Sequence, residues 1–144
     1  MRLSKFLLLF SIPLLFTACD AFEKAGDIND YVGNYVVDTA HERTYHIYWS
    51  QKTFINEKNI NPPIGTKIII SADKKVQYIT KDGETKTGKV KCLEKYIRLT
   101  NIPIDSTYKF YKRNGNKLEY SHESTHFGVE YDVTYRTIGL YKEV

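Results

Sequence analysis

Residues 107–121 read TYKFYKRNGNKLEYS and carry the clearest structural signal in the sequence. Apolar and polar side chains alternate on both sides of the pair Asn114-Gly115. The apolar members are Tyr108, Phe110, Leu118 and Tyr120. Alternation with a period of two is typical of a strand that buries one face, and Asn-Gly between two such runs is a strong hairpin signal. The stretch therefore predicts a β-hairpin.

The same pattern recurs from about residue 31 to the end of the chain, with turn residues between the alternating runs. Asp82-Gly83 separates residues 75–80 from 85–93, residues 71–73 predict a turn, and residues 61–65 (NPPIG) predict a loop. No segment shows a long helical period, and the twelve tyrosines are interleaved with residues that favour strands. We expect an all-β fold: a single antiparallel β-barrel of roughly eight to ten short strands over residues 31–144, with a tight sandwich as the alternative.

Two of the alternating runs are rich in aromatic residues. In the first, Tyr45, Ile47 and Trp49 are expected on one face and His46 on the other, where it would be solvated. The second run alternates in the same way, with one face formed by Val129, Tyr131, Val133 and Tyr135.

The beginning of the chain predicts a secretory signal. Arg2 and Lys5 precede an apolar run over residues 6–16, which is shorter than the roughly 20 residues of a membrane-spanning helix. The run ends in Thr17-Ala18-Cys19, which resembles the lipobox of bacterial lipoproteins, although Phe16 stands where that motif has an aliphatic residue. A plain secretory signal with cleavage nearby is the alternative.

The lipobox resemblance implies a lipid anchor. It implies that residues 1–18 are a signal peptide cleaved between Ala18 and Cys19, that Cys19 carries a thioether-linked lipid, and that its new amino group is acylated, for example with palmitate. Two or more acyl chains hold a protein stably on a membrane. Residues 19–30 would then be the lipidated cysteine and a tether. The expected location is the bacterial cell envelope, on a membrane and facing the periplasm or the cell surface.

Charge and cysteine content narrow the candidate partners. The formal net charge of +4 falls to +2 on removal of residues 1–18, because Arg2 and Lys5 leave with them. So small a surplus predicts no nucleic-acid partner.

Once Cys19 is lipidated, Cys92 is the only cysteine left, which rules out an intramolecular disulfide. Cys92 alternates in phase with Val90, so we expect a buried thiol.

Residues 31–35 (YVGNY) resemble the G-x-W motif of the first lipocalin strand, with Tyr35 in place of tryptophan. Arg136 lies late in the chain, where that family carries an arginine. The resemblance covers about residues 30–144 and implies a small lipocalin-like barrel. It also implies that Arg136 packs over Tyr35, and it raises the question of a ligand-binding cup.

Residues 122–126 (HESTH) match the zinc-protease pattern H-E-x-x-H. In that pattern a helix places both histidines on one side of a zinc ion, and the glutamate acts as general base. Here both flanks alternate like strands, and on a strand His122 and His126 would lie roughly 13 Å apart. We predict a hairpin tip or strand end, with no catalytic, cofactor-binding or metal-binding residue. The alternative is a loop that folds both imidazoles together, with a carboxylate from Glu123, Glu130 or Asp132.

These features favour a non-enzymatic role. No nucleophile elbow and no phosphate-binding loop is present in the sequence. We expect an envelope lipoprotein that needs no cofactor and binds either a small apolar ligand or an envelope protein, unless its tyrosines simply fill the barrel. An inhibitor or immunity factor against an envelope enzyme or toxin is the alternative. A zinc-dependent hydrolase would depend on His122, Glu123 and His126.

Overall fold

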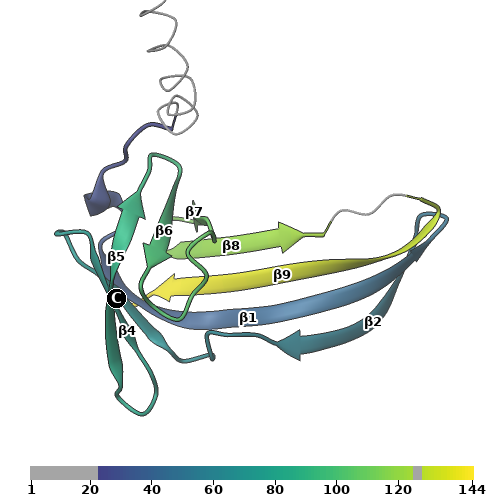
Figure 1. Cartoon of the computed structure of the whole chain (residues 1–144), viewed down its shortest axis with the longest axis horizontal. Coiled ribbons are helices and arrows are strands. Elements are labelled where there is room, and N and C mark those ends of the chain that lie inside the picture. Colours follow the sequence, from purple (N-terminus) through teal and green to yellow (C-terminus); the bar gives the residue numbers. More distant parts are fainter. Residues whose placement is uncertain (1–22, 125–127) are drawn as a thin grey trace, which may run out of the picture.

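The computed structural model describes residues 23–124 and 128–144 (Figure 1). Within these ranges the chain forms one 3₁₀ helix, η1 (Ile28–Asp30), and nine strands. The strands are β1 (Gly33–Tyr48), β2 (Gln51–Asn59), β3 (Lys67–Ile70), β4 (Lys75–Ile79), β5 (Thr85–Cys92), β6 (Tyr96–Thr100), β7 (Phe110–Arg113), β8 (Lys117–Glu123) and β9 (Glu130–Lys142). No helix in the same ranges is long and apolar enough to cross a membrane.

Eight of the strands close into a barrel. Strands β3 to β9 pair with one another in chain order, and β1 pairs with both β3 and β9, so the sheet closes on itself. Every pairing is antiparallel, and β2 is a ninth strand attached to β1 alone. The predicted all-β fold, with a single antiparallel barrel of lipocalin-like form, is confirmed.

The hairpin predicted from residues 107–121 is formed by β7 and β8. Arg113 pairs with Lys117, and Asn114 and Gly115 in the turn between them have φ values of 55° and 79°. Asparagine and glycine tolerate this left-handed conformation better than other residues, which explains why the pair is placed here. Phe110 and Leu118 are buried on the inner face, as the alternation predicts.

Side chains fill the barrel. The core cluster includes aliphatic residues from seven of the eight barrel strands and Phe110 from β7, together with the buried tyrosines Tyr31, Tyr35, Tyr78 and Tyr120. The Tyr35 hydroxyl donates a hydrogen bond to the Tyr31 carbonyl at 2.7 Å, and burial raises the pKa of Tyr35 to about 12. Cys92 is buried, as predicted. Several tyrosines therefore serve as core, and the hydroxyls of Tyr31 and Tyr35 donate to backbone carbonyls inside the molecule.

The segment before β1 is held against the barrel. Ala25 forms an isolated β-bridge with Leu93, the Gly26 amide donates to the Cys92 carbonyl, and the Glu94 amide donates to the Lys24 carbonyl. Ile28 in η1 is buried in the core. Of the stretch expected to be a tether, residues 24–26 are thus bonded to β5 and the turn that follows it, and Ile28 packs into the core.

One implication of the lipocalin resemblance is wrong. Tyr35 lies opposite Lys142 on β9, whereas Arg136 lies opposite Glu42, farther along β1. On adjacent strands a separation of six or seven positions corresponds to roughly 20 Å. Arg136 therefore does not pack over Tyr35.

Candidate functional site

Strands β1, β2 and β9 extend out of the barrel as a long, curved sheet, which we call the arm (residues 41–59 and 130–137; Figure 1). Strand β3 pairs with β1 only over Gly33–Val36. Farther along, the same edge of β1 is taken by β2, from His41 opposite Asn59 to Tyr48 opposite Gln51. The arm exists because β1 and β9 are longer than the barrel strands that flank them.

One side of the arm is aromatic, and we call it the aromatic face. The pairing register places these residues there: Tyr45, Ile47, Lys52, Phe54, Tyr131, Val133 and Tyr135. The Tyr45 ring meets Phe54 and Tyr135 edge-on, with centroids 5.7 and 5.6 Å apart. The Lys52 ammonium lies 4.2 Å from the Tyr45 centroid and 4.3 Å from that of Tyr135. These aromatic and cation–π contacts join the side chains of the face into one layer outside the barrel.

The end of the arm, which we call the tip, exposes further apolar residues. Trp49 and Ser50 form the turn between β1 and β2 with left-handed φ values of 47° and 65°. Trp49 is 66% exposed and Tyr48 51%, and the Trp49 amide donates to the carbonyl of Val129, which is also exposed. The alternation placed Trp49 on a strand face with Tyr45, but the strand ends one residue earlier.

The opposite side of the arm is polar, and it holds His46. The two ring nitrogens face different carboxylates: Nδ1 lies 2.7 Å from Asp132 and Nε2 lies 3.1 Å from Glu130. Only a protonated imidazole can donate from both nitrogens. The hydrogen bond to Asp132, supported by Glu130, raises the pKa of His46. The expected position of His46, away from the aromatic face, is confirmed.

Replacing Asp132 with asparagine should lower the pKa of His46, because the strongest partner of the imidazolium loses its charge. A raised histidine pKa stabilises the fold below the ordinary value of about 6.5, and this contribution is lost as pH rises through the raised value. Titration of the His46 ring protons by NMR measures the shift. The control is Asp73→Asn, which removes a carboxylate that pairs with Lys75 instead. An unchanged His46 titration in Asp132→Asn would contradict the assignment.

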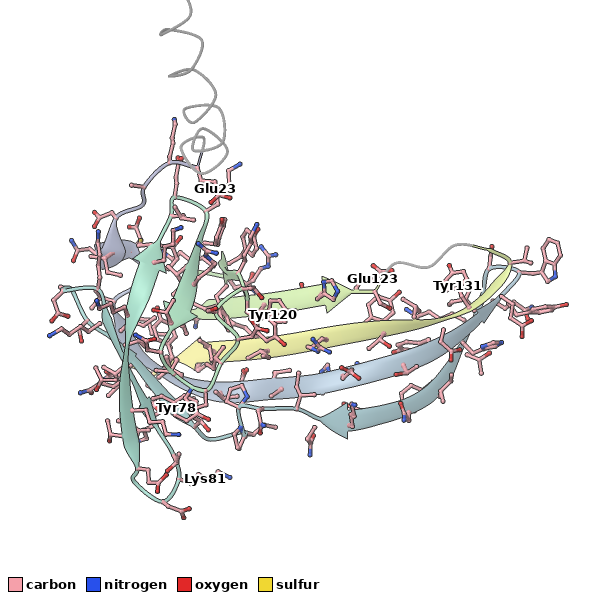
Figure 2. The ribbon with its side chains drawn as sticks, viewed as in Figure 1. Glu23, Tyr78, Lys81, Tyr120, Glu123 and Tyr131 are labelled. Carbon is pink, nitrogen blue, oxygen red and sulfur yellow. The ribbon has the colours of Figure 1, made fainter. Side chains whose placement is uncertain are left out.

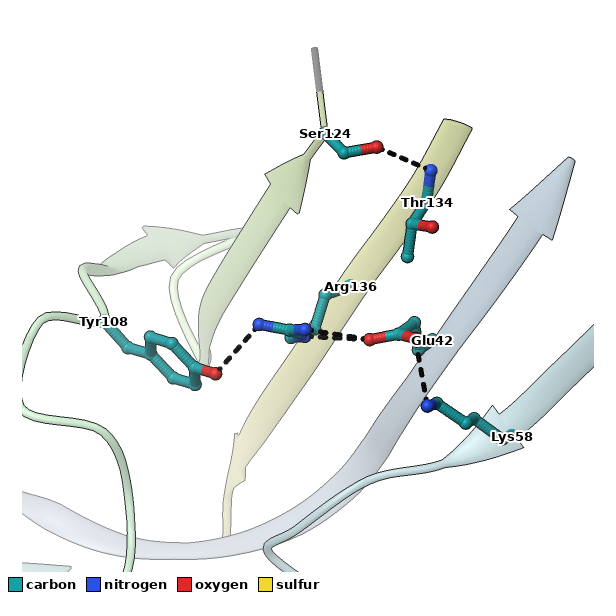
Figure 3. A network of polar contacts seen from close by, with 6 residues as sticks. All are labelled: Glu42, Lys58, Tyr108, Ser124, Thr134 and Arg136. Atoms are coloured by element: carbon teal, nitrogen blue, oxygen red, sulfur yellow. Dashed lines mark hydrogen bonds and ion pairs between the residues drawn. The ribbon is translucent and has the colours of Figure 1, made fainter. Parts of the chain in front are cut away.

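Where the arm joins the barrel, a polar network centres on Arg136 (Figure 3). Its guanidinium donates to Glu42 Oε2 from Nε at 3.1 Å and from Nη2 at 2.9 Å, and to the Tyr108 hydroxyl at 3.2 Å. Lys58 Nζ lies 3.3 Å from the other Glu42 oxygen. The hydrogen bond from Arg136 holds the pKa of Glu42 below its usual range, although burial opposes the shift. Glu42 is thus a charged group of low exposure that is satisfied by two cations.

The same arginine lines a cleft of about 480 Å³ at the barrel end. Tyr108, which also lines it, stacks on Tyr120 with a centroid distance of 3.9 Å. His122 contributes from β8, opposite Arg136. This arrangement could not be predicted from the sequence, because 94 positions separate Glu42 from Arg136 and the closed sheet brings them together.

Replacing Arg136 with methionine should lower the free energy of unfolding by about 1–3 kcal/mol, because it leaves the Glu42 carboxylate, 13% exposed, with Lys58 as its remaining cation. The lower end of this range applies because Arg136 is 36% exposed, and solvent weakens its ion pair with Glu42. Urea unfolding followed by far-UV circular dichroism measures the change. The matched control is Arg43→Met, whose partner Glu57 is well exposed; it should cost less than about 1 kcal/mol.

The pH dependence of that loss provides a second check. A lowered carboxyl pKa stabilises the fold above the ordinary value of about 4.3, and this contribution disappears as pH falls through the lowered value. The difference in the free energy of unfolding between wild type and Arg136→Met should therefore be largest at neutral pH and should become smaller in acid. If the difference is the same at neutral and acid pH, the lost stability comes from packing alone and not from the Glu42 charge.

The start of the H-E-x-x-H match is extended and not helical. His122 and Glu123 lie in β8, opposite Arg136 and Tyr135. The prediction of a strand end is confirmed for these two residues, whereas Thr125 and His126 lie outside the described residues. The alternative carboxylates Glu130 and Asp132 contact His46 from opposite sides of its ring. Over residues 23–124 and 128–144, no three His, Cys, Asp or Glu side chains form a group that could hold a metal ion.

The predicted lipidation residue Cys19 and its neighbour Ala18 lie outside the described residues, so the cleavage and lipid predictions stay predictions. No protein-family model, no curated protein and no solved structure matches the chain.

Proposed function

We propose that the chain is a bacterial envelope lipoprotein, anchored through Cys19, that binds an envelope protein through the aromatic face and tip of the arm and catalyses no reaction. The arm is the observation that carries this proposal. It exposes Tyr48, Trp49 and Phe54 on a sheet, and tryptophan and tyrosine are the residues enriched at the energetic centres of protein interfaces.

The arrangement of the molecule suits this role. Tyr131 lies on the arm, far from Glu23, the first described residue (Figure 2). An anchor near Glu23 would leave the aromatic face accessible. The filled barrel interior favours a protein over a small apolar ligand, because core side chains such as Phe110 and Leu99 occupy the space that a ligand cup would need. An inhibitor or immunity factor is one form that such binding would take.

Site-specific cross-linking in native membranes tests the binding proposal. A photoreactive phenylalanine analogue is placed at Trp49 or at Phe54, and at Tyr141 as a control. Tyr141 is 42% exposed but lies at the barrel end of β9. The proposal expects one protein to be captured from both arm positions and not from Tyr141. Equal capture from all three positions, or none, would count against it.

The captured protein then allows a quantitative test. Once purified, it should bind the wild-type chain with one-to-one stoichiometry. Trp49→Ala and Phe54→Ala should each weaken this binding by about tenfold or more, as truncation of an interface anchor does. Tyr141→Ala should leave it unchanged. If the arm substitutions have no effect, the arm is not the binding surface.

The anchor is tested separately. Cys19→Ser should abolish labelling by radioactive palmitate and release the protein from the membrane fraction, while Cys92→Ser should alter neither. Continued labelling of Cys19→Ser would refute lipidation at this residue without touching the binding proposal.

A further inference from the structure

The outer edge of β2 is an unpaired strand edge. Within the described chain β2 pairs with β1 only, and all nine of its residues, Gln51–Asn59, are exposed. An exposed strand edge carries backbone N–H and C=O groups that are ready to pair with another strand. The question is which strand the side chains of β2 would accept.

A β-bulge determines which side chains of β2 share a face. Phe54 lies opposite Tyr45 and Asn56 opposite Thr44, so Ile55 is an extra residue in β2. Because of this extra residue, Lys52 (opposite Ile47) and Glu57 (opposite Arg43) lie on the same face of the sheet. In a regular strand, residues five positions apart would lie on opposite faces.

We propose that two copies of this chain pair through their β2 edges, antiparallel, about a two-fold axis between Phe54 and Ile55. In this register Lys52 of each copy lies opposite the partner's Glu57, and Phe54 lies opposite the partner's Ile55. Thr53 meets Asn56, and Gln51 meets Lys58, on the polar side. In a two-fold interface each contact occurs twice, so the pairing of Lys52 with the partner's Glu57 gives two ion pairs.

The two faces of the arm favour this register over a neighbouring one. A shift of one position would place Lys52, on the aromatic face, opposite Lys58, on the polar side, so the faces of the two copies would no longer match. The proposed register also brings together the most apolar part of the edge, since Phe54 is 54% and Ile55 49% exposed. Opposite charges therefore flank an apolar centre, an arrangement that is complementary to itself.

The Lys52 ammonium lies over the Tyr45 and Tyr135 rings of its own chain, so the proposed ion pair requires this exposed side chain to turn toward the partner. Glu57 is able to keep its contact within the chain and also meet the partner's Lys52. Its Oε1 lies 3.4 Å from Arg43 Nε within the same chain, and its side chain remains 42% exposed. A carboxylate has two oxygens and can accept several hydrogen bonds. The pairing requires neither lipid nor a second kind of protein, so it does not rest on the proposed function.

Charge reversal tests the register directly. The full chain, purified in detergent, is examined by sedimentation velocity over a range of concentrations. Wild type should form dimers, whereas Lys52→Glu and Glu57→Lys should each dissociate about tenfold or more readily, because both ion pairs become like-charge contacts. The two single variants mixed together should form a heterodimer, and the double variant Lys52→Glu/Glu57→Lys should form dimers again.

Controls separate this result from misfolding. Lys86→Glu reverses a charge on β5 and should leave the dimer unchanged, and far-UV circular dichroism should be the same for every variant. The proposal is overturned if wild type is monomeric at every concentration, or if each single variant dimerises as wild type does. It is also overturned if the two single variants do not associate with each other although both are folded.

Discussion

Replacing Phe110 with alanine should lower the free energy of unfolding by about 3–5 kcal/mol, the cost of removing a large side chain and leaving part of the space as a cavity. Phe110 is 0% exposed, pairs with Ile97 across β6 and β7, and lies 6.1 Å from the Tyr120 ring centroid. A domain of this size has only about 5–15 kcal/mol in total. The substitution should therefore remove a large part of the stability of the barrel.

Urea unfolding followed by far-UV circular dichroism measures this loss. Fluorescence is a poor probe, because the single tryptophan, Trp49, lies exposed at the tip of the arm. The matched control is Phe54→Ala, which removes the same atoms from a side chain that is 54% exposed and should cost less than about 1 kcal/mol. Equal losses at the two positions would mean that the arm is as deeply packed as the barrel.

Replacing Gly88 with alanine should cost about 2–3 kcal/mol, because the added methyl group has no room. Gly88 lies in β5 on the side that faces the core, and a Cβ there would lie 1.9 Å from the Thr100 carbonyl oxygen and 2.9 Å from Ile102. The clash with Thr100 involves backbone, so a rotamer change cannot relieve it. The strands would have to move apart and lose hydrogen bonds between β5 and β6.

Gly33→Ala is the control for this substitution. The three atoms nearest a Cβ at Gly33 all belong to the side chain of Lys142, closest at its Cε at 2.6 Å, and that flexible chain can move aside. We expect a change of less than about 1 kcal/mol, measured by the same urea titration. If both alanine variants are as stable as wild type, β6 does not approach β5 as closely as described.

The sequence predicted those parts of the fold that depend on neighbouring residues. Asn114-Gly115 and Asp82-Gly83 identify their hairpins because a turn of a few residues sets the local geometry. The alternation around Phe110 identifies the buried face for the same reason. These signals are enough to predict an antiparallel barrel with turns in the right places.

The candidate site could not be predicted in this way. The lengths of β1 and β9 produce the arm, but alternation does not show where a strand leaves the barrel. The contact between Glu42 and Arg136 depends on barrel closure and on a bulge at Asp38, which sets the register of β9 against β1. The resemblance to lipocalins assigned Arg136 to Tyr35 because it transferred a position without that register.

The bonds between residues 24–26 and β5 also limit how far the domain can stand from a membrane. Given a lipid on Cys19, five residue steps separate the anchor from Lys24, where the chain is already fastened to the barrel. Even fully extended, the segment from residue 19 to residue 24 spans at most about 18 Å. The barrel would therefore rest almost on the bilayer surface, and only proteins with a domain close to the headgroups would be within its range.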